Sequence, residues 1–212
     1  LMGLGINVNL GPVCDIATDS GAFLYSRSLG QDAETTSQVV SEIVNLMNQN
    51  HIGSVLKHFP GYGNNADTHT GIAKDSRSLA ELEGKDLLPF AAGIQAGCGA
   101  VMVGHVIVKA MDGSLPASLS PAVHEYLRDT MGFTGVIMTD DLVMQAITDQ
   151  YGAGEAAVMA VLAGNDLLCS TEYATQYQAV LQAVLDGRIS VDTLNAAVRH
   201  VLVWKQQVAS YG

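Results

Sequence analysis

The densest group of reactive side chains in this sequence lies in residues 57–71. Lys57 and His58 open the segment, Asp67 and His69 follow, and several glycines and a proline lie between them. The segment is longer and richer in titratable groups than a turn requires, which is typical of loops that carry out chemistry. In extended backbone the Asp67 carboxylate can hold one ring nitrogen of His69 and raise the basicity of the other. The pattern therefore indicates a functional loop, and the alternative is a glycine- and proline-rich turn with solvated polar residues.

Other polar residues follow neighbouring strand-like segments. Lys57 and His58 end one such segment, His105 ends the next, and Asp140 and Asp141 end the one after that. The loop after the first strand-like segment adds two more, Asp15 and Arg27. Functional residues gathered at the carboxyl ends of successive parallel strands are typical of the active face of a (β/α) barrel.

Three of these positions also have a purely structural interpretation. Asp15 fits a turn, Arg27 fits a surface charge, and His105 fits a core histidine that bonds backbone. For the pair Asp140 and Asp141, strand alternation points the two carboxylates in opposite directions. We therefore expect one of the pair to face the site, while the other caps the following helix or bonds backbone.

The elements that would position these residues alternate along the chain. Short, mostly apolar segments predict parallel strands buried on both faces: Ile6–Leu10, Ser54–Lys57, Ala100–Val106, Gly135–Thr139 and Asp166–Cys169. Segments with helical spacing of apolar residues lie between and after them: Glu34–Gln49, Leu79–Ala96, Pro121–Met131, Glu155–Ala163, Glu172–Asp186 and Ser190–Gln207. Such alternation predicts one α/β domain with a parallel sheet, either open or closed into a barrel.

Composition narrows the class of partner. The chain has 212 residues, 48% of them hydrophobic and 15% charged, as in a globular α/β domain. Its net charge of −11 argues against nucleic acid or anionic membrane as a partner. No apolar stretch reaches the roughly 20 residues of a membrane span. The three cysteines are widely spaced and predict buried thiols, and the residues predict neither a metal site nor a cofactor.

The first residues of the sequence, Leu1 to Leu10, do not form a secretion signal, because no basic segment precedes an apolar one. They have the pattern of a helix end, a glycine turn and a core strand. We therefore expect the sequence to begin inside a domain, and the residues do not fix the compartment, with bacterial cytoplasm and cell surface both open.

Two motifs together resemble glycoside hydrolase family 3, in particular its β-N-acetylhexosaminidase branch. One is Lys57-His58-Phe59-Pro60-Gly61 with Asp67-Thr68-His69, and the other runs from Gly135 to Leu142 through Asp140-Asp141. The chain departs from the common family motif at Tyr62 and at Asn64-Asn65. The resemblance spans about Gly5 to Lys205, nearly the whole chain.

The resemblance implies a TIM-type (β/α) barrel that lacks its N-terminal strands, with residues 1–212 forming the C-terminal two-thirds of a single barrel domain. It implies Asp140 as nucleophile, His69 paired with Asp67 as general acid/base, and Lys57, His58 and Arg27 as groups that hold sugar hydroxyls. We add His105 to the expected substrate-binding residues because of its strand-end position.

The implied reaction is removal of terminal β-linked N-acetylglucosamine through a covalent glycosyl-enzyme. The expected substrate is an amino-sugar glycoside derived from peptidoglycan or chitin. The chain is also expected to associate with further copies of itself through the incomplete barrel. Alternatives are a family 3 β-glucosidase, a glycoside phosphorylase, and a partial chain that binds sugar without turning it over. A barrel of the phosphate-binding aldolase type is only weakly matched, by Ser170-Thr171 and Lys57.

Overall fold

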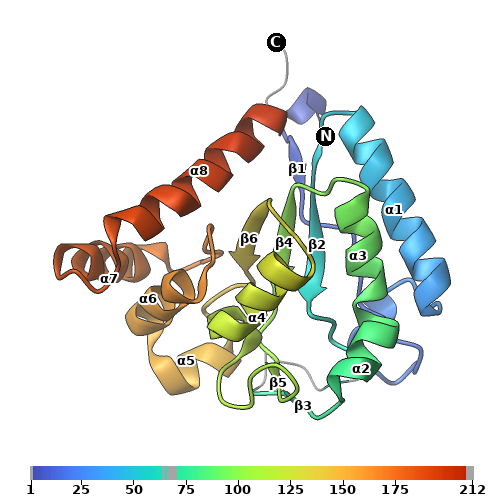
Figure 1. Ribbon diagram of the computed structural model, residues 1–212, viewed down its shortest axis with the longest axis horizontal. Helices are drawn as coiled ribbons and strands as arrows, with labels where there is room; N and C mark the ends of the chain where they lie inside the picture. The colour runs from blue at the N-terminus through green and yellow to red at the C-terminus, as the bar shows by residue number, and fades with distance from the viewer. Residues whose placement is uncertain (1, 64, 66–70, 209–212) are drawn as a thin grey trace.

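The fold is built on a four-stranded parallel sheet with the strand order β1-β2-β4-β6. The computed structural model describes residues 2–63, 65 and 71–208. The strands are β1 Val8–Asn9, β2 Gly53–Phe59, β4 Ala100–Val103 and β6 Val136–Thr139. A second, two-stranded parallel pair is formed by β3 Lys74–Asp75 and β5 Ile107–Val108. Figure 1 shows this pair beyond the carboxyl ends of β2 and β6, near the bottom of the view.

Helices connect and flank the strands. The α-helices are α1 Ala33–Gln49, α2 Leu79–Glu81, α3 Leu88–Gln95, α4 Pro121–Glu125, α5 Gln145–Tyr151, α6 Ala153–Ala163, α7 Tyr173–Leu185 and α8 Val191–Val208. Short 3₁₀ turns cover Met2–Leu4, Tyr25–Arg27 and Ala117–Leu119, and wider π-helical turns cover Leu82–Asp86 and Tyr126–Thr130. None of the helices in the described ranges is both long and apolar enough to cross a membrane.

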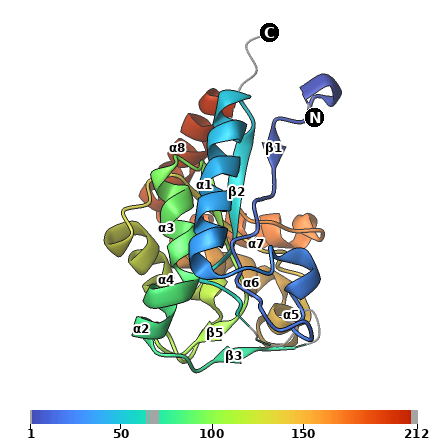
Figure 2. The same ribbon diagram turned by 90° about the vertical axis from the view of Figure 1, so that its right-hand side faces the viewer.

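One face of the sheet packs against α1 and α3, which lie side by side (Figures 1 and 2). Leu56, Val101 and Ile137 project from successive strands into a core cluster that also contains Val40 of α1 and Phe90 of α3. All five side chains are buried, as the alternation of strand side chains requires of a covered face. These two helices therefore cover one face of the apolar strands predicted from the sequence.

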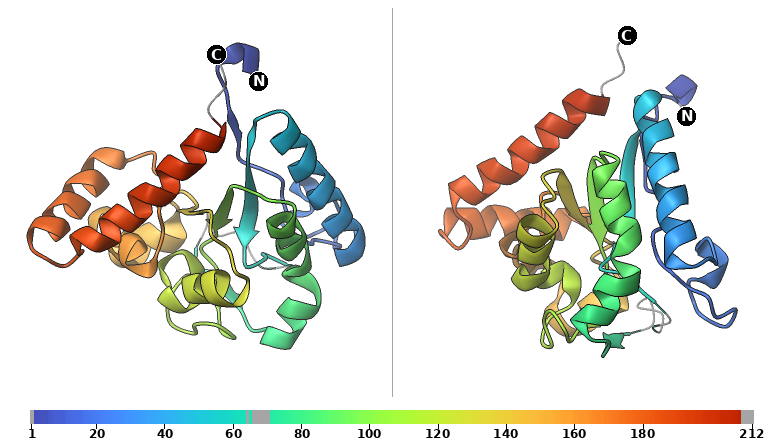
Figure 3. Two further views of the ribbon diagram at one scale, coloured as in Figure 1. Left: turned by 45° about the horizontal axis from the view of Figure 1, so that its top comes forward. Right: turned by 45° about the vertical axis from the view of Figure 1, so that its right-hand side comes forward.

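The opposite face carries the alternate residues of the same strands. Val55, Met102 and Met138 form a second cluster with Trp204 and Val208 of α8. The indole of Trp204 lies over the amino ends of the strands, where a Cβ on Gly99 would fall 2.0 Å from its Nε1 atom. Glycine is therefore required at position 99 for α8 to approach the sheet. Figure 3 shows α6, α7 and α8 together on the β6 side of the sheet.

The predicted helices are present, and two of them widen into π-helical turns, at Leu82–Asp86 and at Tyr126–Thr130. The helix predicted over Leu79–Ala96 begins with the predicted capping box, in which Ser78 and Glu81 bond each other's backbone N–H groups. It then widens at Leu82–Asp86, where Leu87 N donates to Leu82 O, five residues back, before α3 starts. Pro89 has no N–H to donate to the carbonyl of Lys85, so the regular pattern is interrupted at this point.

The strand predictions hold for β2 and β6 but fail in part for the other three segments. The segment predicted as Ile6–Leu10 forms only the two-residue strand β1, and Ile6 and Leu10 are exposed. The segment predicted as Ala100–Val106 pairs in the sheet only as far as Val103 and then turns into the separate strand β5. The predicted strand Asp166–Cys169 forms only an isolated bridge, between Leu167 and Met138. Cys169 N donates to the side-chain hydroxyl of Thr139 instead of to a backbone carbonyl, so the regular ladder is not continued. Helix α5 and the pair β3–β5 were not predicted.

Candidate functional site

Asp140 and Asp141 lie directly beyond the end of β6 and face different surroundings. Asp140 continues the side of the strand on which Val136 and Met138 lie, and its side chain is about one-quarter exposed. Asp141 Oδ1 accepts hydrogen bonds from the backbone N–H groups of Val143 (3.2 Å) and Thr171 (3.3 Å). Asp140 also bonds backbone, since its Oδ1 accepts from Asp141 N (2.8 Å), but its Oδ2 is directed towards His58. Of the two carboxylates, Asp140 is therefore the one that lies near another predicted site residue.

The ring of His58 is oriented by a carboxylate that lies beneath it. Asp15 Oδ2 accepts hydrogen bonds from His58 Nδ1 (2.8 Å) and from its backbone N–H (2.9 Å). Because a carboxylate only accepts, Nδ1 carries the proton, and Nε2 is the nitrogen directed to the site. His58 Nε2 lies 3.9 Å from Asp140 Oδ2, which brings two predicted site residues together.

Asp15 also fixes the start of the loop that follows β2. Its second oxygen, Oδ1, accepts a hydrogen bond from Tyr62 N (2.7 Å), and the Asp15 side chain is fully buried. Sequence analysis left Asp15 as either a site residue or a turn aspartate, although it follows β1 in a Gly-Pro-x-x-Asp motif. The structure identifies it as the residue that holds both His58 and Tyr62.

Lys57 lies within electrostatic range of both Asp140 and a second cation, Arg27. Burial lowers the pKa of Lys57, the Arg27 charge lowers it further, and the carboxylates of Asp140 and Asp15 act in the opposite direction. Arg27 is exposed, with its guanidinium 5.9 Å from the centroid of the Phe23 ring. The family resemblance implied that Lys57, His58 and Arg27 hold sugar hydroxyls, and the structure places Lys57 within electrostatic range of Arg27, Asp140 and Asp15.

The pairing of β2 with β4 shifts register between Leu56 and Phe59, the stretch that contains Lys57 and His58. Strict alternation would send consecutive side chains to opposite faces of the sheet. The shift ends that alternation at the carboxyl end of β2. No residue type in the sequence signals it.

The prediction that His105 contacts a substrate is wrong. His105 is 0% exposed, and both ring nitrogens are bonded within the protein, Nδ1 to Ser118 Oγ (2.7 Å) and Nε2 to the carbonyl of Asp141 (3.0 Å). A carbonyl only accepts, so Nε2 carries the proton and Nδ1 accepts from the Ser118 hydroxyl. His105 instead bonds the carbonyl of Asp141, the residue after Asp140, from a position just beyond the end of strand β4.

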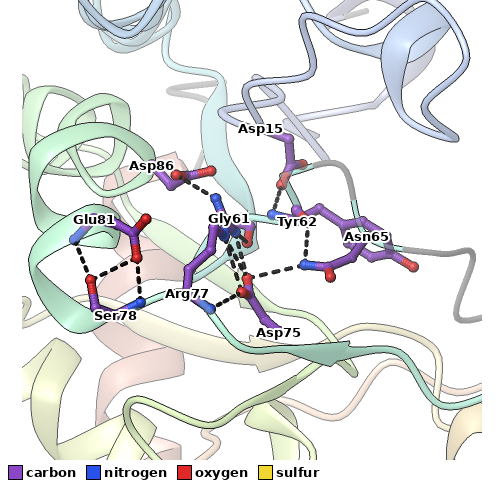
Figure 4. A network of polar contacts seen from close by, with 9 residues as sticks. All are labelled: Asp15, Gly61, Tyr62, Asn65, Asp75, Arg77, Ser78, Glu81 and Asp86. Atoms are coloured by element: carbon purple, nitrogen blue, oxygen red, sulfur yellow. Dashed lines mark hydrogen bonds and ion pairs between the residues drawn. The ribbon is translucent and has the colours of Figure 1, made fainter.

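Asp67 and His69, predicted as the acid/base pair, lie outside the described residues. The flanks of their segment are described, and they are joined by hydrogen bonds, from Arg77 Nη2 to the carbonyl of Gly61 and from Asn65 Nδ2 to Asp75 Oδ2 (Figure 4). Sequence analysis did not single out Arg77 or Asp75, although an Asp-x-Arg spacing shortly after a functional loop is a recognisable signal. Among the described residues, no group of three or more His, Cys, Asp or Glu side chains is arranged to hold a metal ion.

The burial of His105 leads to a prediction about pH and stability. Burial lowers the pKa of His105 below its ordinary 6.5, and burial does the same for His124. The folded protein therefore favours the neutral form of both rings. Their contribution to the free energy of unfolding is complete above about pH 6.5 and is lost as the pH falls further. We expect the free energy of unfolding in urea to fall between about pH 7.5 and 5.5.

Replacing His105 tests its share of that loss. His105→Phe leaves the Ser118 hydroxyl and the Asp141 carbonyl without their partner, which should cost roughly 1–3 kcal/mol at neutral pH. His105→Phe should also flatten the pH dependence of the free energy of unfolding, whereas the exposed control His51→Gln should not. Identical pH slopes in all three proteins would contradict the assignment.

Comparison with known proteins places this arrangement in a family. Residues 1–203 match the sequence profile described as the glycosyl hydrolase family 3 N terminal domain. The chain is 36% identical over 190 residues to a beta-hexosaminidase of Tolumonas auensis, covering 88% of this chain and 55% of the relative. It is 35% identical over 212 residues to one of Stenotrophomonas maltophilia, covering 92% of this chain and 62% of the relative.

Solved structures agree with the sequence matches. A glycoside hydrolase family 3 beta-N-acetylglucosaminidase from Paenibacillus sp. superposes with a TM-score of 0.94 at 38% identity, over 99% of this chain and 41% of the other. A beta-N-acetylhexosaminidase from Beutenbergia cavernae gives a TM-score of 0.85 at 28% identity, over 97% and 64%. The chain thus spans only about two-fifths to two-thirds of these proteins. Because the profile covers nearly all of it, the chain belongs to glycosyl hydrolase family 3.

Proposed function

We propose that this protein is a retaining glycoside hydrolase that removes terminal β-linked N-acetylglucosamine. The observation that carries the proposal is the placement of Asp140, at a strand end and 3.9 Å from a histidine ring whose other nitrogen is held by a buried carboxylate. Family membership and the names of the similar proteins support the reaction class and the sugar. The natural substrate class we propose is an amino-sugar glycoside from peptidoglycan or chitin.

In the proposed first step, each predicted site residue has a separate role. An oxygen of Asp140 attacks the anomeric carbon while the bond to the leaving oxygen breaks, and His69 gives that oxygen a proton. A covalent glycosyl-enzyme results. Lys57 and Arg27 donate hydrogen bonds to sugar hydroxyls, and His58 meets the sugar through Nε2. In the second step water attacks the same carbon, His69 takes its proton, and Asp140 is released.

Histidine suits this double role at neutral pH. A carboxylic acid must have its pKa raised to protonate a leaving group, whereas histidine has an ordinary pKa near 6.5. Asp67 would orient His69 and stabilise its protonated form. A histidine also repels anions less than a carboxylate does, so phosphate in place of water is an outcome that the assays must distinguish. Release of a sugar phosphate in phosphate buffer would identify that outcome.

We also propose that residues 1–212 form the C-terminal two-thirds of a TIM-type barrel. The support is the parallel order of β1, β2, β4 and β6, the further bridge at Leu167, and the superposition on larger family 3 enzymes. A barrel of this type needs eight strands to remove its sheet edges. Taken alone, the chain keeps two such edges.

Asp140 is expected to be the nucleophile. Replacing Asp140 with Asn in the full-length protein should remove nearly all turnover and prevent trapping by a 5-fluoro N-acetylglucosaminyl fluoride. The matched control is Asp141→Asn, which retains an oxygen that accepts from Val143 N and Thr171 N and should keep most activity. Peptide mass spectrometry should locate the trapped sugar on Asp140. A sugar found on Asp141 or Asp15 would refute the assignment.

His69 is expected to act as acid and base. His69→Ala should lose roughly 10²–10⁴-fold on glycosides with poor leaving groups, yet cleave the glycosidic bond of dinitrophenyl glycosides, which need no proton. Asp67→Ala should give a milder version and a shifted pH profile. His51→Ala, before the start of β2, serves as control. Equal losses on both substrates would point to a structural role for His69.

Isolated residues 1–212 are expected to self-associate. The described surface of α8 carries an exposed apolar row at helical spacing, formed by Val191, Leu194, Val198 and Leu202. Exposed apolar rows and open sheet edges favour association. Size-exclusion chromatography should give an oligomer that Val198→Lys with Leu202→Glu reduces. A monomer at every concentration, fully active on a nitrophenyl N-acetylglucosaminide, would contradict both this expectation and the partial barrel.

A further inference from the structure

Arg77 lies at the centre of a network of buried charges on the loop side of the sheet, shown in Figure 4. Its Nε atom donates to both carboxylate oxygens of Asp75, at 3.0 and 2.9 Å. Its Nη1 atom lies 2.6 Å from Asp86 Oδ2, and its Nη2 atom donates to the carbonyl of Gly61 at 3.2 Å. One guanidinium therefore joins three separate pieces of chain.

The two carboxylates depend on this cation. Asp75 is 2% exposed and Asp86 is 1% exposed, so neither can rely on water. Burial alone would raise the pKa of Asp75, but hydrogen bonds from Arg77 and Asn65 outweigh it and leave the pKa lowered. Removal of one partner from a buried ion pair leaves the other charge uncompensated, which proteins tolerate poorly. Loss of Arg77 would therefore leave Asp86 without its ion-pair partner and Asp75 without its main donor.

The glycines before residue 64 are shaped around the same group. A Cβ on Gly63 would lie 2.7 Å from Arg77 Nη2, and a Cβ on Gly61 would lie 2.7 Å from the Cβ of Asp86. Both glycines have positive φ angles, +56° and +108°, which other residues rarely adopt. The backbone leaving β2 is thus wrapped closely against the guanidinium and its carboxylate partner.

A second connection runs from the network to the candidate site. Asn65 Nδ2 donates to Asp75 Oδ2 (3.0 Å) and to the carbonyl of Tyr62 (2.8 Å). Tyr62 N in turn donates to Asp15 Oδ1, and Asp15 holds His58. Polar contacts therefore extend without interruption from Arg77 to the histidine that faces Asp140.

We propose that Arg77 is a positioning residue for the acid/base step, acting by clamping the two flanks of the segment that contains Asp67 and His69. Gly61 to Asn65 lie before that segment and Asp75 to Arg77 lie after it, and Arg77 bonds both sides. This inference rests on the proposed function, because it assigns the proton transfer to His69. The planar fork of arginine is needed, since Arg77 serves Asp75, Asp86 and Gly61 in different directions and a lysine ammonium supplies a single point charge.

The test compares leaving groups in variants of the full-length protein. In Arg77→Met, hydrolysis of N-acetylglucosaminides with poor leaving groups should fall at least roughly tenfold, within the range of general acid–base contributions. Formation of the glycosyl-enzyme from a dinitrophenyl glycoside should be nearly unchanged. Added azide should speed its turnover, because azide needs no general base. Arg77→Lys should show the same pattern more weakly.

The matched control is Arg188→Met, which removes the same side chain from an exposed ion pair with Glu155 and should change neither substrate. A uniform loss on both substrates in a folded Arg77→Met protein, or no loss on either, would overturn the proposal. If Arg77→Met does not fold, Asn65→Ala decides: it removes only the link between Asp75 and Tyr62, and it must show the same dependence on leaving group.

A readout independent of activity separates this proposal from the proposed function. Amide hydrogen exchange at Tyr62 and Arg77, whose N–H groups bond Asp15 and Asp75, should accelerate in Arg77→Met and remain unchanged in Arg188→Met. Unchanged exchange at Tyr62 would refute the clamp, even in an active hydrolase. A different pair of results is accelerated exchange in Arg77→Met together with a wild-type protein that cleaves no glycoside. That pair of results would refute the proposed function and the positioning role of Arg77, while the clamp itself would stand.

Discussion

The structure around the site depends on satisfying carboxylates that are buried where the strands end. An ionised carboxylate removed from water costs several kcal/mol unless donors surround it. Asp15 meets that requirement with two N–H groups and a ring nitrogen, all on the segment from His58 to Tyr62. Asp75 and Asp86 meet it through Arg77. The backbone must bring these donors to the carboxylates, and in doing so it places His58 and the loop flanks.

The sheet provides the rigid reference for this arrangement. Strands β2, β4 and β6 are buried on both faces, by α1 and α3 on one side and by α8 with the second apolar cluster on the other. Residues at strand ends are consequently held by packing on either side. Asp140, at the end of β6, is held in the same way, and His105 bonds the carbonyl of Asp141, the next residue. A nucleophile benefits from such fixation because small misplacements reduce reactivity strongly.

The proposed chemistry divides between two kinds of support. The nucleophile is attached to the packed sheet, whereas the proposed acid/base belongs to a loop whose flanks are held by charges. Polar contacts of this kind are directional, so they specify where a loop leaves and rejoins the fold without requiring an apolar core beneath it. The two supports meet at Asp15, which contacts both the end of β2 and the loop that follows.

The sequence by itself predicted the order of the main strands, the helices other than α5, and the family. Apolar periodicity predicted that order, and side-chain alternation predicted different surroundings for Asp140 and Asp141, because both depend on local backbone geometry. The tertiary structure alone decided the rest. It assigned Asp15 and Arg77 their partners, ended β4 before His105 and buried that ring, and shifted the register of β2 at Lys57. These features depend on which distant groups meet in space, and a buried charge or ring shows its role only when its partners are in place.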